Sequence, residues 1–216
     1  MVVATSTWVK KKNVPYKKRE KKSSSKHLLQ LISTSHSLLS VEERETDKEM
    51  EDVRVKDEAL RLIGLFEVLP RLVVFDLDYT LWPFYNELHS KRGMPYLYPQ
   101  AKGILQAFQD KGIEMAIASR SPTADIANTF LDQLGIQSMF VAKEIFTSRT
   151  FKADHFKAIH RRTGIPFNSM LFFDDEYGNI DTVSKMGVTS ILVDDGLNLQ
   201  ELHSGLQKFS SPNEQI

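Results

Sequence analysis

The sequence predicts an α/β fold, a Rossmann-like parallel sheet with helices on both faces. Short apolar segments alternate with longer segments of helical periodicity from residue 72 onward. Several of the helical segments stop directly before a glycine, which commonly follows the last residue of a helix. Strands that alternate with helices in this way are joined by right-handed crossovers and lie parallel. No internal repeat is visible in the chain.

The expected elements follow one another with short connections. A first helix is expected over residues 57–69, because Ala59, Ile63 and Phe66 recur at helical spacing until Pro70 interrupts it. A folded domain is then expected over residues 70–210. Its predicted strands are residues 72–76, 114–119, 138–141, 170–173 and 190–193, and its predicted helices are residues 101–111, 123–134, 153–163, 180–186 and 199–209.

The composition limits what kind of protein this is. A chain of 216 residues has room for one domain of ordinary size and appendages. It contains no cysteine, which excludes disulfides and thiolate metal sites and allows an intracellular location. No apolar run approaches the roughly 20 residues that span a bilayer. We expect a cytoplasmic monomer with no membrane partner.

Positive and negative charges are segregated in the N-terminal part, although the formal net charge of the chain is zero. Residues 1–41 carry nine Lys or Arg and one acid, a net charge of +8, and residues 42–58 carry nine acids and four bases, a net charge of −5. Such a segment has too little apolar surface to offset the entropy of ordering it. We therefore predict that residues 1–56 form a disordered extension.

Three alternatives stay open for this extension. Its basic, Ser-containing composition is compatible with an organelle transit peptide, although the bases are mostly Lys. Its Lys clusters are compatible with nucleic-acid contact, but no aromatic platform or folded reader accompanies them, so we expect no nucleic-acid partner. A third alternative is that translation starts at Met50.

Two carboxylates lie at the exit of the first predicted strand. The apolar run Leu72–Phe75 is typical of a buried parallel strand, and Asp76 and Asp78 follow it. Open α/β sheets bind ligands beyond the carboxyl ends of their strands, and alternation places both acids on the same side. Adjacent carboxylates raise each other's pKa unless a cation lies between them. The pair favours a ligand site, and a strand-end cap is the alternative.

Polar residues after the later strands complete a set of four motifs. The segment Asp76-Leu77-Asp78-Tyr79-Thr80 resembles the Asp-x-Asp-x-Thr motif of the haloacid dehalogenase superfamily of phosphotransferases. Ser119, Lys152 and the pair Asp174-Asp175 are similar to its second, third and fourth motifs, in the same order. Four ordered motifs are far more specific than any one of them.

Within this superfamily the chain looks like the magnesium-dependent phosphatase-1 family. The resemblance covers residues 69–209 and includes the runs Phe75-Asp76-Leu77-Asp78-Tyr79-Thr80-Leu81-Trp82-Pro83-Phe84 and Thr163-Gly164-Ile165-Pro166-Phe167. Relatives with cap domains insert them after the first or second motif. Here only about twenty residues separate Thr80 from Ala101, too few for an independent domain. We expect a capless, open site in which residues 82–98 form at most a flap.

The two acids of the first motif are expected to have different roles. Asp76 is the expected nucleophile, because an ionised carboxylate needs no base to activate it, and Asp78 is the expected general acid and then base. The concentrated negative charge calls for Mg²⁺. The resemblance implies that a carboxylate oxygen of Asp76, the backbone carbonyl of Asp78 and one acid of the pair Asp174-Asp175 hold the ion. We favour Asp175, with Asp174 and Thr80 supporting the ligands from behind, although the sequence alone does not separate the two acids.

The remaining motif residues are expected to bind phosphate. Ser119 would donate to a phosphoryl oxygen, Lys152 would neutralise transition-state charge, and the backbone amides of Leu77 and Arg120 would complete the cradle. The expected function is therefore a Mg²⁺-dependent phosphomonoesterase that forms an aspartyl-phosphate. Its expected substrates are phosphotyrosine or a phosphorylated small molecule such as a phosphosugar. A catalytically idle phosphate-binding scaffold and a polynucleotide end-phosphatase are the alternatives.

Weaker signals have simpler interpretations. His155 and His160 are five residues apart, which is not metal-ligand spacing, so we expect packing or surface roles. Asn179 is expected to cap a helix, and the Arg120 side chain to be exposed. Five aromatic residues either line a pocket for the leaving group or pack the flap: Trp82, Phe84, Tyr85, Tyr96 and Tyr98.

Overall fold

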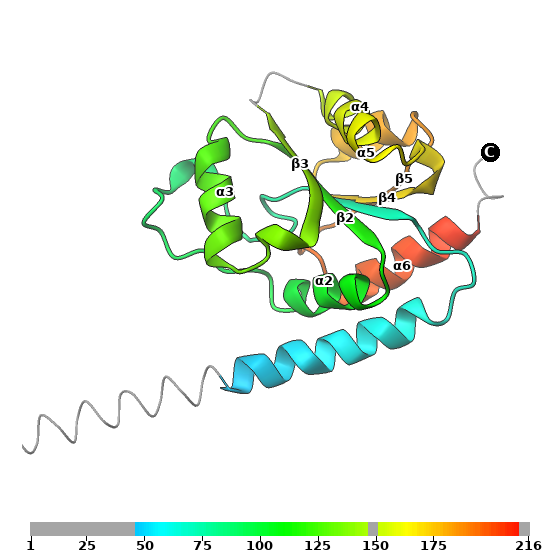
Figure 1. Cartoon of the computed structure of the whole chain (residues 1–216), viewed down its shortest axis with the longest axis horizontal. Helices are drawn as coiled ribbons and strands as arrows, with labels where there is room; N and C mark the ends of the chain where they lie inside the picture. Colours follow the sequence, from blue (N-terminus) through cyan, green and yellow to red (C-terminus); the bar gives the residue numbers. More distant parts are fainter. Residues whose placement is uncertain (1–45, 147–150, 212–216) are drawn as a thin grey trace, which may run out of the picture. The chain divides into compact units, whose positions relative to one another are not determined.

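The computed structural model of the chain describes residues 46–146 and 151–211. Within these residues a sheet of five parallel strands has the order β3-β2-β1-β4-β5 (Figure 1). The predicted α/β fold with a parallel sheet is thus confirmed. The strands are β1 (Leu72–Phe75), β2 (Glu114–Arg120), β3 (Phe140–Phe146), β4 (Met170–Asp174) and β5 (Thr189–Leu192).

Helices cover both faces of this sheet, as predicted (Figure 1). One face carries an N-terminal helix, whose described part is residues 46–63, together with α2 (Ala101–Asp110), α3 (Ala124–Gln133) and α6 (Leu199–Ser210). The other face carries α4 (Lys152–Thr163) and α5 (Tyr177–Ser184). Three short 3₁₀ turns are η1 (Asn86–Leu88), η2 (Gln137–Met139) and η3 (Phe167–Ser169).

The position of β1 at the centre of the sheet explains why its sequence is apolar throughout. Val73 and Phe75 pack into one core, and Leu72 and Val74 pack into the other, because successive side chains point to opposite faces. All four are fully buried. Burial of each such side chain contributes about 1.5–3 kcal/mol relative to exposure. Strand β1 is thereby held between β2 and β4, and the residues that follow it lie at the middle of the sheet edge.

The N-terminal helix differs from the prediction, which placed it at residues 57–69. Its described part begins at residue 46 and ends at residue 63. Val55 is buried with Ala59 and Ile63 against the core, and Lys56 Nζ lies 3.1 Å from Asp110 Oδ2 on α2. Residues 46–56 therefore belong to the folded part, and their assignment to a disordered extension was wrong. The high charge of this stretch concealed its helical apolar spacing, and residues 1–45 lie outside the described residues.

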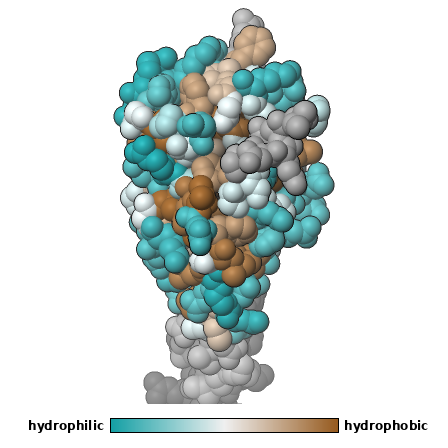
Figure 2. All heavy atoms as spheres, turned by 90° about the vertical axis from the view of Figure 1, so that its right-hand side faces the viewer, coloured by the Kyte–Doolittle hydropathy of each residue, from teal (hydrophilic) through white to brown (hydrophobic). Residues whose placement is uncertain are grey.

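Residues 64–69 were predicted to continue the helix, but the segment between the N-terminal helix and β1 is not helical in the structure. This segment packs on α6. Phe66 contacts the ring of His203, with 5.7 Å between the ring centroids. Figure 2 views the molecule from the right-hand side of Figure 1, and hydrophobic residues gather near the centre of that face. The connecting segment, residues 64–71, contributes the exposed side chains Leu65 and Val68.

Two other boundaries were displaced. The third strand was predicted at residues 138–141 but β3 is Phe140–Phe146, because η2 occupies the residues before it. Its alternation includes Glu144, which is buried and lies 3.3 Å from Arg162 Nε, so the apolar pattern is interrupted. Helix α5 begins at Tyr177 rather than at residue 180, and only its cap residue Glu176 separates it from the acidic pair.

The two places where relatives insert cap domains, after the first and after the second motif, carry no additional domain in the described part of the chain. The connection from β1 to α2 contains only the short turn η1, and α3, η2 and β3 occupy most of the chain between β2 and α4. Among the described helices, none is long and apolar enough to cross a membrane.

Candidate active site

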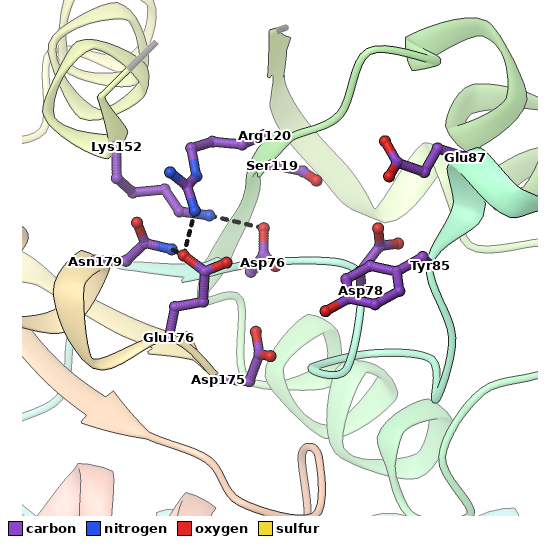
Figure 3. Close-up of a pocket in the computed structure, with 10 residues that line it drawn as sticks. All are labelled: Asp76, Asp78, Tyr85, Glu87, Ser119, Arg120, Lys152, Asp175, Glu176 and Asn179. Atoms are coloured by element: carbon purple, nitrogen blue, oxygen red, sulfur yellow. Dashed lines mark hydrogen bonds and ion pairs between the residues drawn. The ribbon is translucent and has the colours of Figure 1, made fainter. Parts of the chain in front are cut away.

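A cavity of about 200 Å³ lies beyond the carboxyl ends of β1, β2 and β4 (Figure 3). Six of the site residues expected from the sequence line it, since each ends a strand, follows a strand or begins a helix at this edge. Leu77, Thr80 and Asp174 lie behind it and are fully buried. The cavity is lined by Asp76, Asp78, Tyr85, Glu87, Ser119, Arg120, Lys152, Asp175, Glu176 and Asn179.

Lys152 is the central cation of this site. It is the first residue of α4 and only 2% exposed. Its Nζ donates to Asp76 Oδ1 and to the Ala118 carbonyl, both at 2.7 Å, and lies 2.8 Å from Asp174 Oδ2. Burial alone would lower the pKa of Lys152, but the two carboxylates outweigh it and raise that pKa above its usual value. The ammonium therefore stays charged and joins three strand ends.

Asp76 directly follows β1, and its position is fixed by the sheet. Its backbone N–H donates to the Phe173 carbonyl at 3.0 Å. Burial raises the pKa of Asp76 to about 7, although the Lys152 ammonium opposes this shift and the charges of Asp174 and Asp78 add to it. One buried ammonium thus does not fully compensate the carboxylates around it.

Asp78 is held through one of its two oxygens. Its Oδ1 accepts from the indole Nε1 of Trp82 at 2.6 Å and from the backbone N–H of Asn86 at 3.1 Å. Burial raises the pKa of Asp78, and these two hydrogen bonds lower it. This contact could not be predicted from local sequence, because it depends on the path of the loop after β1.

The acidic pair at the end of β4 is divided between the cavity and the layer beneath it. Asp174 is fully buried, contacts Lys152, and accepts from Asn179 Nδ2 at 2.9 and 3.1 Å. Asp175 lines the cavity. Burial first, and then the charge of Asp174, raise the pKa of Asp175 to about 6.

Asn179 has a different role from the helix cap that was predicted. The N-terminal cap position of α5 is Glu176, and Asn179 lies inside the helix with its amide directed at Asp174. Its Nδ2 also lies 3.2 Å from Glu176 Oε2. Glu176 pairs in turn with Arg120, so the Arg120 side chain is partly buried rather than freely exposed (Figure 3).

Ser119 and His155 meet at the end of β2. Ser119 lines the cavity, and its carbonyl lies 3.1 Å from His155 Nε2. His155 is buried beside Phe146, with 4.5 Å between their ring centroids. Burial, followed by the charge of Lys152, lowers the pKa of His155 to about 4. Of the packing and surface roles expected for the two histidines, the structure shows packing: His155 is buried, and the half-buried His160 has its Nδ1 2.7 Å from the Ile165 carbonyl.

The five aromatic residues divide between the cavity and the core. Trp82 is fully buried and stacks on Phe84 at 5.7 Å, so these two pack the loop after β1. Tyr85 lines the cavity and is 49% exposed. Tyr96 packs on Phe84 at 5.5 Å, and Tyr98 lies against Gly196.

Two glutamates that also line the cavity, Glu87 and Glu176, were not identified from the sequence, although Glu176 directly follows the acidic pair.

The oxygen donors of this cavity fit a hard divalent cation. Asp76 and Asp175 both present carboxylates there, and burial, followed by neighbouring carboxylates, raises the pKa of each, so a bound cation would favour their ionised forms. In the described residues no three His, Cys, Asp or Glu side chains converge as a complete metal site. Two carboxylates with a backbone carbonyl and waters match Mg²⁺, which keeps several waters and does not need an all-protein cage.

Comparison with known proteins is consistent with this arrangement. The acid phosphatase family matches residues 68–97 and 91–212. The human protein Magnesium-dependent phosphatase 1 is 41% identical over 157 residues, which cover 66% of this chain and 88% of that protein. A HAD-like hydrolase superfamily protein of Schizosaccharomyces pombe is 35% identical over 144 residues, which cover 56% of this chain and 83% of that protein.

A solved structure shows the same fold. A Had-superfamily hydrolase from Ehrlichia chaffeensis has a TM-score of 0.53 and 12% sequence identity, and the comparison covers 65% of this chain and 98% of that chain. All four motifs, from Asp76 to Asp175, lie inside the matched family range. The chain therefore belongs to the acid phosphatase family of the haloacid dehalogenase superfamily and is of the magnesium-dependent phosphatase 1 type.

Proposed function

We propose that this chain is a Mg²⁺-dependent phosphomonoesterase that carries the phosphoryl group on Asp76 between two chemical steps. One observation carries the proposal: Asp76 and Asp78 share one cavity, yet Lys152 holds the first and neutral N–H donors hold the second. The Lys152 ammonium opposes the burial that raises the pKa of Asp76, and a bound Mg²⁺ would favour its ionised form further. Among the described residues Asp78 forms no ion pair, and its contacts with neutral N–H donors leave it suited to exchange a proton with the leaving group.

The first step transfers the phosphoryl group to the enzyme. An oxygen of Asp76 attacks phosphorus, the bond to the leaving oxygen breaks, and its electron pair stays with that oxygen. Asp78 supplies the proton that the leaving oxygen takes up. In the second step water attacks the aspartyl-phosphate, Asp78 takes a proton from that water, and phosphate leaves with Asp76 regenerated.

The cation would be held by Asp76, Asp175 and the backbone carbonyl of Asp78, with Asp174 and Thr80 behind them. When bound, Mg²⁺ would offset the negative charge of the carboxylates and the phosphate. The name of the human relative and the oxygen donors of the cavity support this metal.

The phosphoryl oxygens would be bound by a second group of residues in the same cavity. Ser119 would donate its hydroxyl, Lys152 its ammonium, and the backbone amides of Leu77 and Arg120 would add two neutral donors. Ser119, Arg120 and Lys152 all line the cavity, which supports this assignment.

The substrate class we propose is phosphotyrosine or a phosphosugar. Tyr85 stands half-exposed at the cavity and offers a surface for an aromatic ring, and Glu87 beside it offers an acceptor for sugar hydroxyls. The described connections carry no cap domain that would exclude a bulky leaving group. The presence of both Asp76 and Asp78 in the cavity favours turnover over an idle phosphate-binding scaffold.

The proposal is tested by hydrolysis of a panel of aryl and sugar phosphates by the purified full chain, with Mg²⁺ and with a chelator. Wild type should require Mg²⁺, and Asp76→Asn should lose at least about a thousandfold in kcat. Asp181→Asn is the matched control, because Asp181 is an exposed carboxylate of α5 paired only with Lys185 in the described residues. Equal, metal-independent rates for wild type and Asp76→Asn would show that the proposal is wrong.

A further inference from the structure

The loop after β1 places an indole N–H on the carboxyl group of Asp78. We propose that Trp82 is a positioning residue that directs acid–base chemistry to one oxygen, Oδ2, of Asp78. This inference rests on the proposed function, in which Asp78 protonates the leaving oxygen. It assigns to Trp82 a part in the reaction in addition to its part in the core.

The two oxygens of Asp78 have different surroundings. Oδ1 accepts from Trp82 Nε1 at 2.6 Å and from the Asn86 backbone N–H at 3.1 Å. In the described residues, Oδ2 accepts no hydrogen bond from the protein. Asp78 is itself a lining residue of the cavity. One carboxyl oxygen is thus committed to the protein, and the other is available to a ligand.

This asymmetry decides where a proton is carried. A proton on Oδ1 would face two N–H donors and would weaken both hydrogen bonds. A proton on Oδ2 leaves both bonds intact, so the neutral carboxylic acid carries its proton on Oδ2. The same hydrogen bonds prevent the carboxyl group from rotating and exchanging its two oxygens. Trp82 and Asn86 therefore present Oδ2 to the leaving group as the oxygen that exchanges the proton.

A tight backbone turn brings the indole to this position. The Leu77 carbonyl accepts from the N–H groups of Leu81 at 2.8 Å and Trp82 at 3.2 Å, and Tyr79 N–H donates back to the Trp82 carbonyl at 2.7 Å. Tyr79 has a φ of 55°, in the left-handed region that non-glycine residues rarely adopt. Such a conformation persists where the surroundings over-determine it, and these hydrogen bonds do so.

The indole ring is locked once it is there. Trp82 is fully buried, lies nearly parallel to Phe84 with an interplanar angle of 5°, and meets Phe130 edge-on with 6.1 Å between centroids. A buried indole N–H needs an acceptor, and Asp78 Oδ1 is that acceptor. A purely structural role would end at this satisfied hydrogen bond, so the experiment must measure proton transfer itself.

The experiment compares two substrates that differ in their need for a proton. Wild type and Trp82→Phe, as full chains with Mg²⁺, are assayed for kcat/KM on phenyl phosphate and on 2,4-dinitrophenyl phosphate. The dinitrophenolate leaves without protonation, whereas phenolate needs it. We expect Trp82→Phe to lose about tenfold or more on phenyl phosphate and less than about threefold on the dinitrophenyl ester.

Two further variants separate positioning from packing. Phe84→Leu removes the stacked ring and keeps the indole N–H, so any loss should be the same for both substrates. In an Asp78→Asn background, Trp82→Phe should add no further loss on phenyl phosphate, because Trp82 acts through Asp78. If Trp82→Phe does not fold by circular dichroism, benzothienylalanine at position 82 replaces the N–H with sulfur while keeping the shape of the ring system.

The outcomes distinguish this inference from the proposed function. A Trp82→Phe loss that is equal for both substrates, or a substrate-selective loss that Phe84→Leu reproduces, would overturn the positioning role. A further loss in the Asp78→Asn background would also overturn it. If wild type hydrolyses neither ester with Mg²⁺, the proposed function itself fails.

Discussion

The ammonium of Lys152 connects the ends of three strands. It contacts Asp76 after β1, the Ala118 carbonyl in β2 and Asp174 in β4. A buried charge removed from such a set leaves its partners uncompensated, which is far more costly than the loss of an exposed ion pair. The same residue is therefore expected to support both the fold and the phosphate site.

Lys152→Met tests this dual role. The variant should lower the free energy of unfolding by about 3 kcal/mol, because two buried carboxylates lose their cation. Added Mg²⁺ should restore part of that loss, since the ion offers a second positive charge to the same cavity. Urea denaturation with and without Mg²⁺ measures both effects. Lys185→Met, which breaks an exposed pair with Asp181, should stay within about 0.5 kcal/mol, and equal losses for the two variants would contradict the account.

His155 makes the free energy of unfolding sensitive to acid. The pKa of its imidazole is about 4 in the fold, below the ordinary 6.5, because it is buried and lies near the Lys152 ammonium. The unfolded chain therefore binds the proton first, and the stability contributed by neutral His155 is complete above pH 6.5 and is lost as the pH falls toward 4. His155→Gln should flatten this loss.

Denaturation curves of wild type and His155→Gln between pH 7 and pH 4.5 provide the measurement. The difference between their unfolding free energies should change by on the order of 2 kcal/mol across that interval, with wild type losing more. His160→Gln is the control, because His160 is half-buried and lies farther along α4. Parallel curves for wild type and His155→Gln would contradict the expected shift.

At the scale of single residues, the sequence located the charges of the cavity but not the contacts that orient them. Asp76, Ser119, Lys152 and Asp175 were identifiable because each stands at the end of a strand or the start of a helix. The donation from Trp82 to Asp78 depends on the turn with Tyr79 in a left-handed conformation. No propensity indicates such a turn, so that contact was seen only in the structure.

At the scale of elements, the N-terminal helix is joined to α2 by close packing. A Cβ added at Gly103 of α2 would lie 2.7 Å from the Asp52 carbonyl oxygen and 2.8 Å from Val55 Cβ. Both distances are shorter than real side chains allow, so glycine is what lets the two helices approach this closely. Lys102 Nζ adds an ion pair at 3.2 Å to Asp52 Oδ2.

Gly103→Ala tests this packing. The added methyl should displace the N-terminal helix and lower the free energy of unfolding by about 2 kcal/mol, in the range found for overpacked cores. Gly178→Ala is the matched control, because nothing lies within 4 Å of a Cβ added there. The control should be neutral or slightly stabilising, as alanine favours helix over glycine. Chemical denaturation of both variants decides the matter, and a neutral Gly103→Ala would show that the helix does not pack as described.

The predicted element boundaries were accurate where the apolar periodicity was clear and wrong where buried charged residues interrupted it. Helices α2 and α6 were predicted within one residue of each end, since both show a strong apolar face and a recognisable end. The N-terminal helix and β3 were misplaced, because acidic residues such as Asp52 and Glu144 are buried in them with basic partners. Pairing across the fold cannot be read from local sequence.

At the scale of the whole molecule, the strand order explains where the site forms. Strand β1 lies between β2 and β4, so the chain leaves it in one direction along the sheet and later returns on its other side. Ligand sites of open α/β sheets occur at such a reversal. The alternation of strands and helices predicted a parallel sheet, and the strand order fixes that the four motifs meet at one edge.

Removal of residues 2–45 tests whether the site is complete without the N-terminal part of the chain. All ten residues that line the cavity lie between Asp76 and Asn179. We therefore expect kcat and KM for small aryl phosphates to change by less than about twofold. The cut leaves the described part of the N-terminal helix intact. A collapse of activity in a shortened chain that still shows the wild-type circular dichroism spectrum would place part of the site outside the described residues.

The central claim is that Asp76 carries the phosphoryl group, and its most direct test is to find that group there. Turnover of phenyl phosphate with Mg²⁺ is quenched in acid, and the peptide that contains Asp76 is analysed by mass spectrometry. The account predicts one added phosphoryl group, removable by hydroxylamine as an acyl phosphate is, and absent from Asp76→Asn. Steady hydrolysis by wild type with no phosphoryl group on that peptide at any quench time would contradict it.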